Sequence, residues 1–274
     1  MLHGTIENRS YLIFNAMPFP ALPPLPASAE DLVRLKAADW HAVTQAEPVA
    51  AAQWMLIGAR LGNPDAQTTL GQWLLDGHGL DRQPTDALAW FLKAALQGHP
   101  MGQNMAGRAL ENGWGCKADA AAAVHWYRLA AQQGLDAAMY NLANLLVTGQ
   151  GIAQDHAAAL DWYRLAAQQG HVKSKTKIGR FYETGLVVAQ DLEAAFVCFE
   201  EGARGGDFRG QFNYAGMLAQ RGQLDAALEW LRKVPLTATP AYQEEVGPLL
   251  LQSPHPGFRA VGQQMLDNLA LAAK

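Results

Sequence analysis

Cysteine is scarce in this chain of 274 residues, which contains only Cys116 and Cys198. The sequence repeats every 36 residues, as described below, and the two cysteines lie in units that are two repeats apart. Their Cα atoms are therefore expected to lie well beyond the ~7 Å separation that a disulfide tolerates. We therefore expect two free thiols, which fits a reducing compartment. Cys198 has no basic neighbour in the sequence and takes the place of a repeated tryptophan, so we expect a buried, inert thiol rather than a nucleophile.

Charge and long apolar runs are limited as well. The net charge is −4, with both signs interspersed, so the composition gives no reason to expect a nucleic-acid partner. No run of 18 apolar residues occurs, so we do not expect insertion into a membrane. The start of the chain holds one arginine and an apolar run from Tyr11 to Phe14, too short for a secretory signal peptide. We expect a cytoplasmic protein, with the periplasm as the less favoured alternative.

What the sequence does contain is a repeat. Residues 120–134 read AAAAVHWYRLAAQQG and residues 156–170 read HAAALDWYRLAAQQG, so that twelve of fifteen positions match at an offset of 36. The same spacing separates four tryptophans and five glycines: Trp54, Trp90, Trp126 and Trp162, and Gly62, Gly98, Gly134, Gly170 and Gly206. Self-similarity at a period of this length predicts an array of stacked supersecondary units.

Each unit is expected to be a pair of helices. Ala138, Leu142 and Leu146 form one apolar stripe along a first helix, over 136–148. Gly149 follows this stripe, and a glycine ends a helix readily because it adopts left-handed backbone angles. Neither helix of a pair can bury its stripe alone, so several copies must stack.

The second helix of the unit is expected over 156–169. The carboxylate of Asp155 is suited to cap its first turn. The aromatic residues of the repeated Trp-Tyr pair, here Trp162 and Tyr163, are expected to lie in the core. Trp126 is the equivalent of Trp162 in the preceding unit.

The chain is expected to have three parts. Residues 1–28 are rich in proline, which favours an extended polyproline II conformation, and form an N-terminal arm. Residues 29–234 form the helical repeat array, beginning with a helix over 30–46. Residues 235–274 form a final pair of helices that caps the open end of the array.

The unit pattern A-x-x-x-L-G-x-x-L-x-x-G-x-G-…-D-x-x-x-A-x-x-W-Y-x-x-A-A-x-x-G resembles the Sel-one-like repeat, a longer-looped relative of the tetratricopeptide repeat. The match is fullest over 138–170 and extends over about 47–234. The resemblance implies an all-α fold, a right-handed α-solenoid (superhelix) of antiparallel helix pairs with 36-residue repeats. It also implies an adaptor that brings proteins together. One secreted branch of the family staples each unit with paired cysteines, and their absence here argues against an exported protein.

No residue set with catalytic or metal-binding chemistry stands out. His78 lies in Gly77-His78-Gly79, but Arg82 replaces the third glycine of a phosphate-binding Gly-x-Gly-x-x-Gly, and the feature recurs in the repeat loops. No histidine pair puts two metal ligands on one helical face, and no Ser/His/Asp arrangement is apparent. We expect no catalytic residue, no metal and no cofactor.

The first helix of each pair is expected to line the concave face of the solenoid. Its side chains opposite the apolar stripe should face the groove, where an arginine or asparagine recurs at Arg108, Asn144 and Arg180. Such a row is suited to bind the backbone of an extended peptide, although a merely solvated face would show the same pattern. The candidate partner-binding residues are Thr68, Gln72, Asn104, Arg108, Glu111, Tyr140, Asn144, Lys173, Thr176, Arg180 and Phe212, together with Trp114 in a loop.

Two local features leave alternatives open. Trp114 lies between two glycines and is either an exposed interface residue or a cover for a helix end. Lys173, Lys175 and Lys177 with Arg180 form a basic patch that would suit an acidic segment or would simply be solvated.

These features predict a non-enzymatic adaptor or scaffold that binds a protein or an extended peptide in the concave groove. The alternative is a regulatory accessory subunit that docks on a partner enzyme and modulates it. The oligomeric state does not follow from the sequence.

Overall fold

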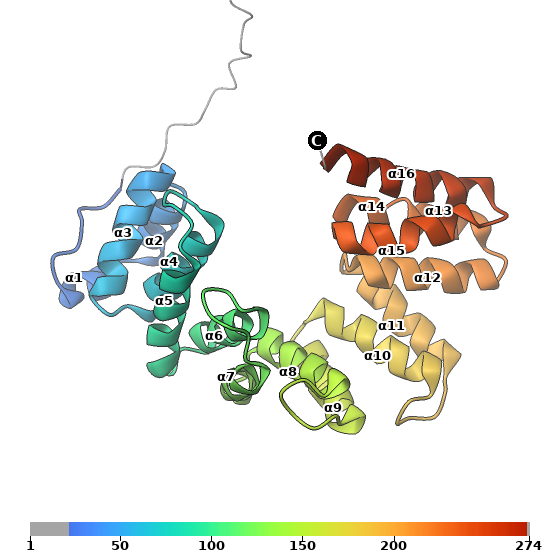
Figure 1. Ribbon diagram of the computed structural model, residues 1–274, viewed down its shortest axis with the longest axis horizontal. Coiled ribbons are helices and arrows are strands. Elements are labelled where there is room, and N and C mark those ends of the chain that lie inside the picture. Colours follow the sequence, from blue (N-terminus) through green and yellow to red (C-terminus); the bar gives the residue numbers. More distant parts are fainter. Residues whose placement is uncertain (1–21, 273–274) are drawn as a thin grey trace, which may run out of the picture. The chain divides into compact units, whose positions relative to one another are not determined.

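A computed structural model describes residues 22–272, and all regular structure in this range is helical (Figure 1). Most of the predicted proline-rich arm lies outside the described residues. The helices are α1 (Ala29–Arg34), α2 (Ala37–Thr44), α3 (Pro48–Arg60), α4 (Pro64–Asp76), α5 (Pro84–Leu96), α6 (Pro100–Asn112), α7 (Ala120–Gln132), α8 (Asp136–Thr148), α9 (His156–Gln168), α10 (Val172–Thr184), α11 (Leu192–Arg204), α12 (Phe208–Gln220), α13 (Leu224–Leu231), α14 (Val234–Thr237), α15 (Pro240–Leu251) and α16 (Pro256–Ala272). The expected all-α fold is confirmed.

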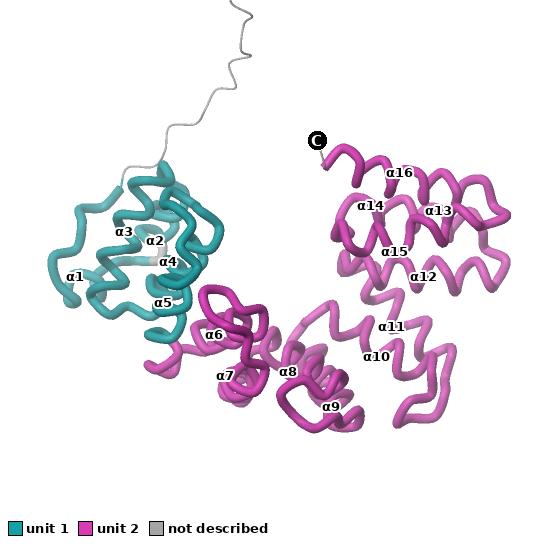
Figure 2. Tube along the Cα trace, viewed as in Figure 1, with its two compact units in different colours: residues 1–94 teal, residues 95–274 magenta. Residues whose placement is uncertain are grey.

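The chain divides into two compact units, which we call unit 1 (residues 1–94) and unit 2 (residues 95–274) (Figure 2). In the first unit α3 packs on α4, and in the second each helix from α6 to α13 packs on the next one along the chain. We call the first helix of each pair helix A (α4, α6, α8, α10 and α12) and the second helix B (α5, α7, α9, α11 and α13). Repeats 1 to 4 begin with the first four A helices, whose starts are 36 residues apart. The predicted solenoid of 36-residue helix pairs is therefore confirmed.

Helix boundaries in the repeats follow the signals in the sequence. Asp155 caps α9, since its carboxylate accepts a hydrogen bond from the backbone N–H of Ala158 at 2.9 Å. Gly149 ends α8 in the left-handed region, with φ of 72°. Asp119 and Asp191 cap the N-termini of α7 and α11 in the same way as Asp155 caps α9. In repeats 2 to 4, these capping residues therefore set where helix A ends and helix B begins.

The region predicted as one helix over 30–46 is two helices, α1 and α2. Leu35 takes extended backbone angles and ends α1. The carboxylate of Asp39 accepts a hydrogen bond from the backbone N–H of Lys36 at 2.7 Å, which starts α2. The single long helix was wrong because a second capping residue restarts the helix after the break.

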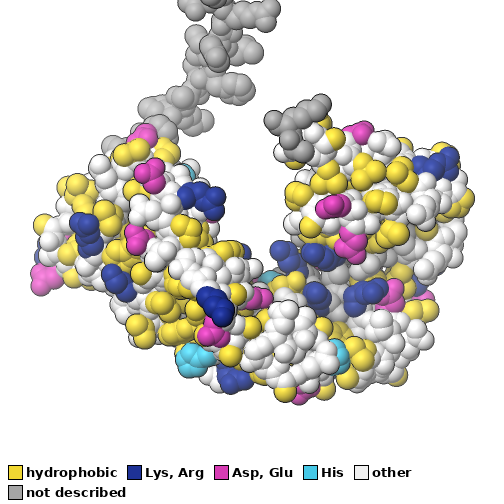
Figure 3. Space-filling model, viewed as in Figure 1, with side chains coloured by type: hydrophobic (Ala, Val, Ile, Leu, Met, Phe, Trp, Pro, Cys, Tyr) yellow, Lys and Arg dark blue, Asp and Glu magenta, His cyan; other side chains and the backbone are white. Residues whose placement is uncertain are grey.

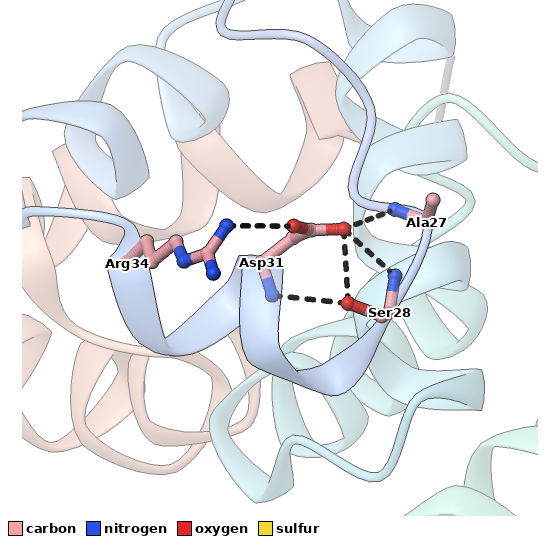
Figure 4. Close-up of polar contacts among 4 residues, drawn as sticks. All are labelled: Ala27, Ser28, Asp31 and Arg34. Carbon is pink, nitrogen blue, oxygen red and sulfur yellow. Dashed lines mark hydrogen bonds and ion pairs between the residues drawn. The ribbon is translucent and has the colours of Figure 1, made fainter.

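The start of α1 is a reciprocal capping box (Figure 4). The backbone N–H of Asp31 donates to the hydroxyl of Ser28, and the Asp31 carboxylate accepts from the backbone N–H of Ser28 at 3.0 Å. Donation from the Ser28 hydroxyl, and then from the backbone N–H of Ala27, holds the pKa of Asp31 below its usual value. Ser28 and Asp31 therefore act together as the cap of α1.

In repeats 1, 2 and 4, an aromatic ring of helix B packs on a glycine of helix A, and these pairs are Phe91 with Gly71, Tyr127 with Gly107 and Phe199 with Gly179. Tyr127 and Phe199 are fully buried. A Cβ atom placed on Gly107 would lie 2.7 Å from the Tyr127 ring, and one on Gly179 would lie 2.7 Å from the Phe199 ring. The missing side chain lets the two helices approach until the ring fills the space between them.

The tryptophans of the repeated Trp-Tyr pair are less buried than we expected. Tyr127 and Tyr163 are 0% exposed, whereas Trp126 and Trp162 are half-buried. Adjacent residues on a helix point about 100° apart, so only one of the two can face helix A. The prediction of a core position was right for the tyrosines and wrong for these two tryptophans; Trp54, at 1% exposed, is core.

The C-terminal end of the described chain is a further helix pair. α15 packs on α16, and α13 and α14 also contact α16. The predicted helix pair over 241–252 and 257–272 is present within about a residue at each boundary. The role of residues 235–274 as a cap, like the division into arm, array and cap, stays a prediction.

Candidate partner-binding surface

The ninth residue of helix A carries the predicted row of polar side chains: Gln72, Arg108, Asn144 and Arg180. The Asn144 side-chain oxygen accepts a hydrogen bond from the hydroxyl of Tyr163 at 2.7 Å. Arg180 forms an ion pair with Glu183 on the same helix. In unit 1, the Gln72 amide donates to Asp76 at 2.8 Å. These side chains already have partners within their own repeats, so a partner protein would have to share them.

Three predicted contact residues are buried and cannot form part of an exposed surface. Thr68 is 8%, Asn104 3% and Thr176 3% exposed. The hydroxyl of Thr68 donates to the carbonyl of Pro64, and the Asn104 side-chain oxygen accepts from Asn141 at 3.0 Å. All three occupy the fifth position of helix A, where a short side chain is covered by the neighbouring helices. The prediction was wrong for these residues because the 36-residue period shows which residues take equivalent places in the repeats but not how deeply each side chain is buried.

Larger residues at the same fifth position stay partly accessible. Tyr140 of α8 and Phe212 of α12 are both half-buried. The Tyr140 ring lies tilted against the His171 ring, with 4.6 Å between the ring centres, and Phe212 meets Tyr242 edge-on at 6.1 Å. Aromatic rings that are half-covered on one side offer apolar area to a partner on the other.

Trp114 and its neighbours form a small cluster on repeat 2. The guanidinium of Arg108 lies 5.1 Å from the centre of the Trp114 ring, a cation–π contact. Glu111 accepts a hydrogen bond from the buried hydroxyl of Tyr127 at 2.6 Å. Trp114 is half-buried, so part of its indole stays accessible, and its role as an interface residue stays a prediction.

The predicted basic patch on α10 divides between two faces. Lys175 forms an ion pair at 2.9 Å with Glu201 of α11 and so belongs to the side facing helix B. Lys177 lies on the other side with Arg180, because residues two apart on a helix point in nearly opposite directions. Lys173 is exposed near the start of the helix.

Lys177, Arg180 and Arg209 form what we call the cationic cluster. Burial lowers the pKa of the Lys177 ammonium, and the charges of Arg209 and Arg180 lower it further. Figure 3 shows Lys and Arg side chains (dark blue) gathered near α10 and α12. The chain as a whole is acidic, so this concentration of positive charge is a local feature of repeat 4 and the helix that follows it.

Asp207 is the carboxylate buried beside this cluster. It is 5% exposed and acts on Lys177 in the direction opposite to the two arginines. One of its oxygens accepts from the backbone N–H of Gly210 at 3.3 Å, and the other has no hydrogen-bond partner among the described residues. The pKa of Lys177 is nevertheless lowered, first by burial and then by the charges of Arg209 and Arg180.

Aromatic rings border the cationic cluster. The Arg209 guanidinium lies 4.5 Å from the ring centre of Phe208 and 5.3 Å from that of Tyr242. Contacts with ring faces hold a guanidinium in place while its edge stays free to donate hydrogen bonds.

A pocket of about 250 Å³ lies next to the cluster, between the A helices of repeats 3 and 4. Its lining is mostly apolar and includes two of the three cationic side chains. The lining residues are Val147, Tyr163, Lys177, Arg180, Phe181, Thr184 and Leu186. The pocket therefore offers an apolar floor next to positive charge.

Some of these residues could have been found from the sequence and others could not. Arg209 takes the same helix-A position in α12 that Lys173 takes in α10, so the period could have placed it. Phe181 and Leu186 also occupy regular repeat positions. Tyr242 lies in α15, outside the repeats, and only the packing of the chain brings it to Arg209.

Two kinds of feature are absent from residues 22–272. No group of three or more His, Cys, Asp or Glu side chains in this range is arranged to hold a metal ion. No helix in the same range combines the length and the apolar character that crossing a membrane requires.

The helix pairs and their stacking define a class of protein, the α-solenoids built from short helical repeats. The model of the Sel1 repeat family matches the chain over more than half of its length, at residues 64–99, 100–135, 136–171 and 172–207. The chain belongs to the Sel1 repeat family. Proteins with these repeats generally mediate protein–protein interactions. No curated protein matches the sequence of this chain.

Two solved structures are similar over 86% of the chain. One is a Sel1 repeat protein from Oxalobacter formigenes, with 24% identity and a TM-score of 0.73, and the match covers 100% of that protein. The other is c5321, a protective antigen present in uropathogenic Escherichia coli strains, with 26% identity and a TM-score of 0.64. The present chain spans 52% of the c5321 chain. These similarities support the fold.

Proposed function

We propose that the protein is a non-enzymatic adaptor that binds a protein or an extended peptide on the helix-A surface of α6, α8, α10 and α12. The observation that carries the proposal is the cationic cluster on α10 and α12, which is bordered by the aromatic rings of Phe208 and Tyr242. Successive A helices offer contacts at regular intervals, which suits an extended partner segment. We also propose a cytoplasmic location, on the ground that Cys116 and Cys198 are both free thiols.

Affinity capture with surface variants tests this proposal. The helix-A variant combines Arg108→Ala, Arg180→Ala and Arg209→Ala. Asn144 is left unchanged because it accepts the hydrogen bond of the buried Tyr163 hydroxyl. The matched control removes three arginines from B helices: Arg128→Ala, Arg164→Ala and Arg204→Ala.

The native cell extract supplies the candidate partners. We expect a protein that is recovered with the wild type and with the helix-B control, and that is lost with the helix-A variant. Equal recovery with all three proteins would contradict a binding surface on helix A. If the recovered partner is an enzyme whose turnover changes on addition of this protein, the role is that of a regulatory accessory subunit.

A further inference from the structure

Repeat 4 departs from the other repeats in the loop that follows its helix A. Repeats 1 to 3 have a glycine as the second residue after the αL glycine that ends this helix: Gly79, Gly115 and Gly151. Repeat 4 has Val187, with φ of 58°, the one non-glycine residue with positive φ among the described residues. A β-branched residue is strained at this angle, and such strain often marks a functional segment.

The same loop exposes apolar side chains. Leu186 is 42% and Val187 49% exposed, where repeat 3 has Gln150 and Gly151. Leu186 also lines the pocket between repeats 3 and 4. The strained backbone, the exposed leucine and the pocket therefore coincide at one place in unit 2.

The size of the pocket limits what it can hold. At about 250 Å³, it falls below the range of roughly 300–1,000 Å³ that is usual for small-molecule sites. Val147, Phe181 and Leu186 give it an apolar lining. A volume of this size with such a lining suits one apolar side chain of a bound segment better than a whole cofactor.

Charge determines what should lie beside that side chain. Lys177 and Arg180 both line the pocket, and Arg209 acts on Lys177 from α12. Glu183 forms an ion pair with one nitrogen of the Arg180 guanidinium, but the Arg180 side chain is still 56% exposed. A guanidinium has five donors, so Arg180 can bind a second carboxylate while it keeps Glu183.

We propose that the pocket between repeats 3 and 4 binds an apolar side chain of an extended partner segment, and that Lys177 and Arg180 pair with an acidic side chain adjacent to it. The partner is thus an acidic peptide segment in which aspartate or glutamate flanks an apolar residue. This inference rests on the proposed adaptor function, and it adds the chemistry of the partner and the repeat that recognises it.

A phage-displayed library of random eight-residue peptides tests the chemistry without a known partner. The immobilised full-length proteins are the wild type, a charge-reversed variant (Lys177→Glu with Arg180→Glu) and a control (Lys117→Glu with Arg128→Glu). The control makes the same change in net charge at two exposed positions away from the pocket. Thermal melting followed by circular dichroism checks that both variants remain folded.

We expect the wild type and the control to select peptides in which an acidic residue is adjacent to an apolar one. The charge-reversed variant should lose that preference. A synthetic peptide from the wild-type pool should bind the wild type at least 10-fold more tightly than the charge-reversed variant in fluorescence anisotropy.

Two results would overturn the inference, and they bear differently on the proposed function. Selected peptides without acidic enrichment, or with the same enrichment in the charge-reversed variant, would reject this pocket while leaving the adaptor function standing. Selection of no peptide by any of the proteins would reject the inference and count against the peptide-binding function as well.

The apolar half of the site has its own test. Leu186→Ser should weaken binding of the selected peptide at least 3-fold, because it removes an exposed side chain from the pocket lining. Leu165→Ser is the matched control, since Leu165 has nearly the same exposure, 43%, on helix α9. Equal affinity of the two variants for the peptide would contradict a role for the pocket.

Discussion

Tyr163 illustrates how much of a repeat depends on a single side chain. Its ring is fully buried, and its hydroxyl donates to Asn144 of the partner helix. Trp162, the next residue toward the N-terminus, is half-buried. The two residues look equally important in the repeated sequence, but only the tyrosine joins helix A to helix B through both packing and a hydrogen bond.

Tyr163→Ala should lower the free energy of unfolding by about 3–5 kcal/mol, the usual range for removing a large core ring. Trp162→Ala should cost about 1–2 kcal/mol, since much of its surface stays in water. Tyr163→Phe isolates the hydroxyl and should cost about 0.5–1.5 kcal/mol. Urea denaturation measures all three, and a Trp162 loss equal to that of Tyr163 would contradict the assignment of the core.

Val187 and Gly151 occupy the same loop position in successive repeats. A Cβ on Gly151 would lie 2.3 Å from the carbonyl carbon of Ala120, so this loop packs directly on the start of α7. Val187 already has a Cβ, so the loop of repeat 4 cannot make such a close approach. Repeat 4 therefore retains strain at a place where the other repeats avoid it.

Val187→Gly should stabilise the protein by about 0.5–1 kcal/mol. Relief of the left-handed angle gains roughly 1–2 kcal/mol, and the extra entropy of glycine in the unfolded chain offsets about 0.5–1 kcal/mol of that gain. Gly151→Val is the reciprocal change and should destabilise, because its side chain has no room against α7. Thermal melting distinguishes the two, and stabilisation by Gly151→Val would show that the loop contact is not required.

At the scale of the element, the B helices of repeats 2 to 4 (α7, α9 and α11) each start at an aspartate whose carboxylate binds backbone N–H groups. Because the first N–H groups of a helix lack partners within the helix, this side chain fixes where the helix begins. The same residue type recurs at Asp119, Asp155 and Asp191, which keeps successive B helices in one frame.

Asp155→Ala should cost about 1 kcal/mol of stability through loss of the α9 cap. Asp161→Ala on the same helix is the control and should cost less than about 0.5 kcal/mol. Asp161 is 73% exposed and has only a long contact with Arg164, at 3.4 Å. Chemical denaturation measures the difference, and equal effects would mean that the cap does not stabilise α9.

At the scale of the whole molecule, stability in unit 2 is a property of neighbouring pairs. Each helix from α6 to α13 contacts the next helix along the chain, and contacts between more distant helices are few until α14 and α16. In such an array, stability is approximately a sum of repeat and interface contributions. Damage to one repeat should therefore remain local under native conditions.

Tyr163→Ala should raise the rate of amide hydrogen exchange in α8, α9 and α10 well above the rate in α15 and α16. Removal of the Tyr163 ring leaves a cavity between α8 and α9, and α10 packs on α9. The helices α15 and α16 instead pack mainly on each other. Hydrogen exchange read by mass spectrometry gives the result helix by helix. A uniform increase across residues 95–274 would instead show that unit 2 unfolds only as a whole.

The sequence by itself determined the all-α fold, the 36-residue period, the boundaries of the helix pairs and the aspartate and glycine residues that set them. These features follow from signals within a few residues, such as capping side chains and left-handed glycines, and the repetition multiplies each signal. The sequence also identified Arg180 and the basic character of α10 as candidates for binding.

Only the tertiary structure decided which side of a helix each residue faces and how deep it lies. Thr176 and Arg180 are both polar residues four apart on α10, yet the first is covered by neighbouring helices and the second lines a pocket. Tyr242 reaches Arg209 from outside the repeats. Burial and charge clustering arise from contacts between helices that are distant along the chain, and a period in the sequence contains no measure of those distances.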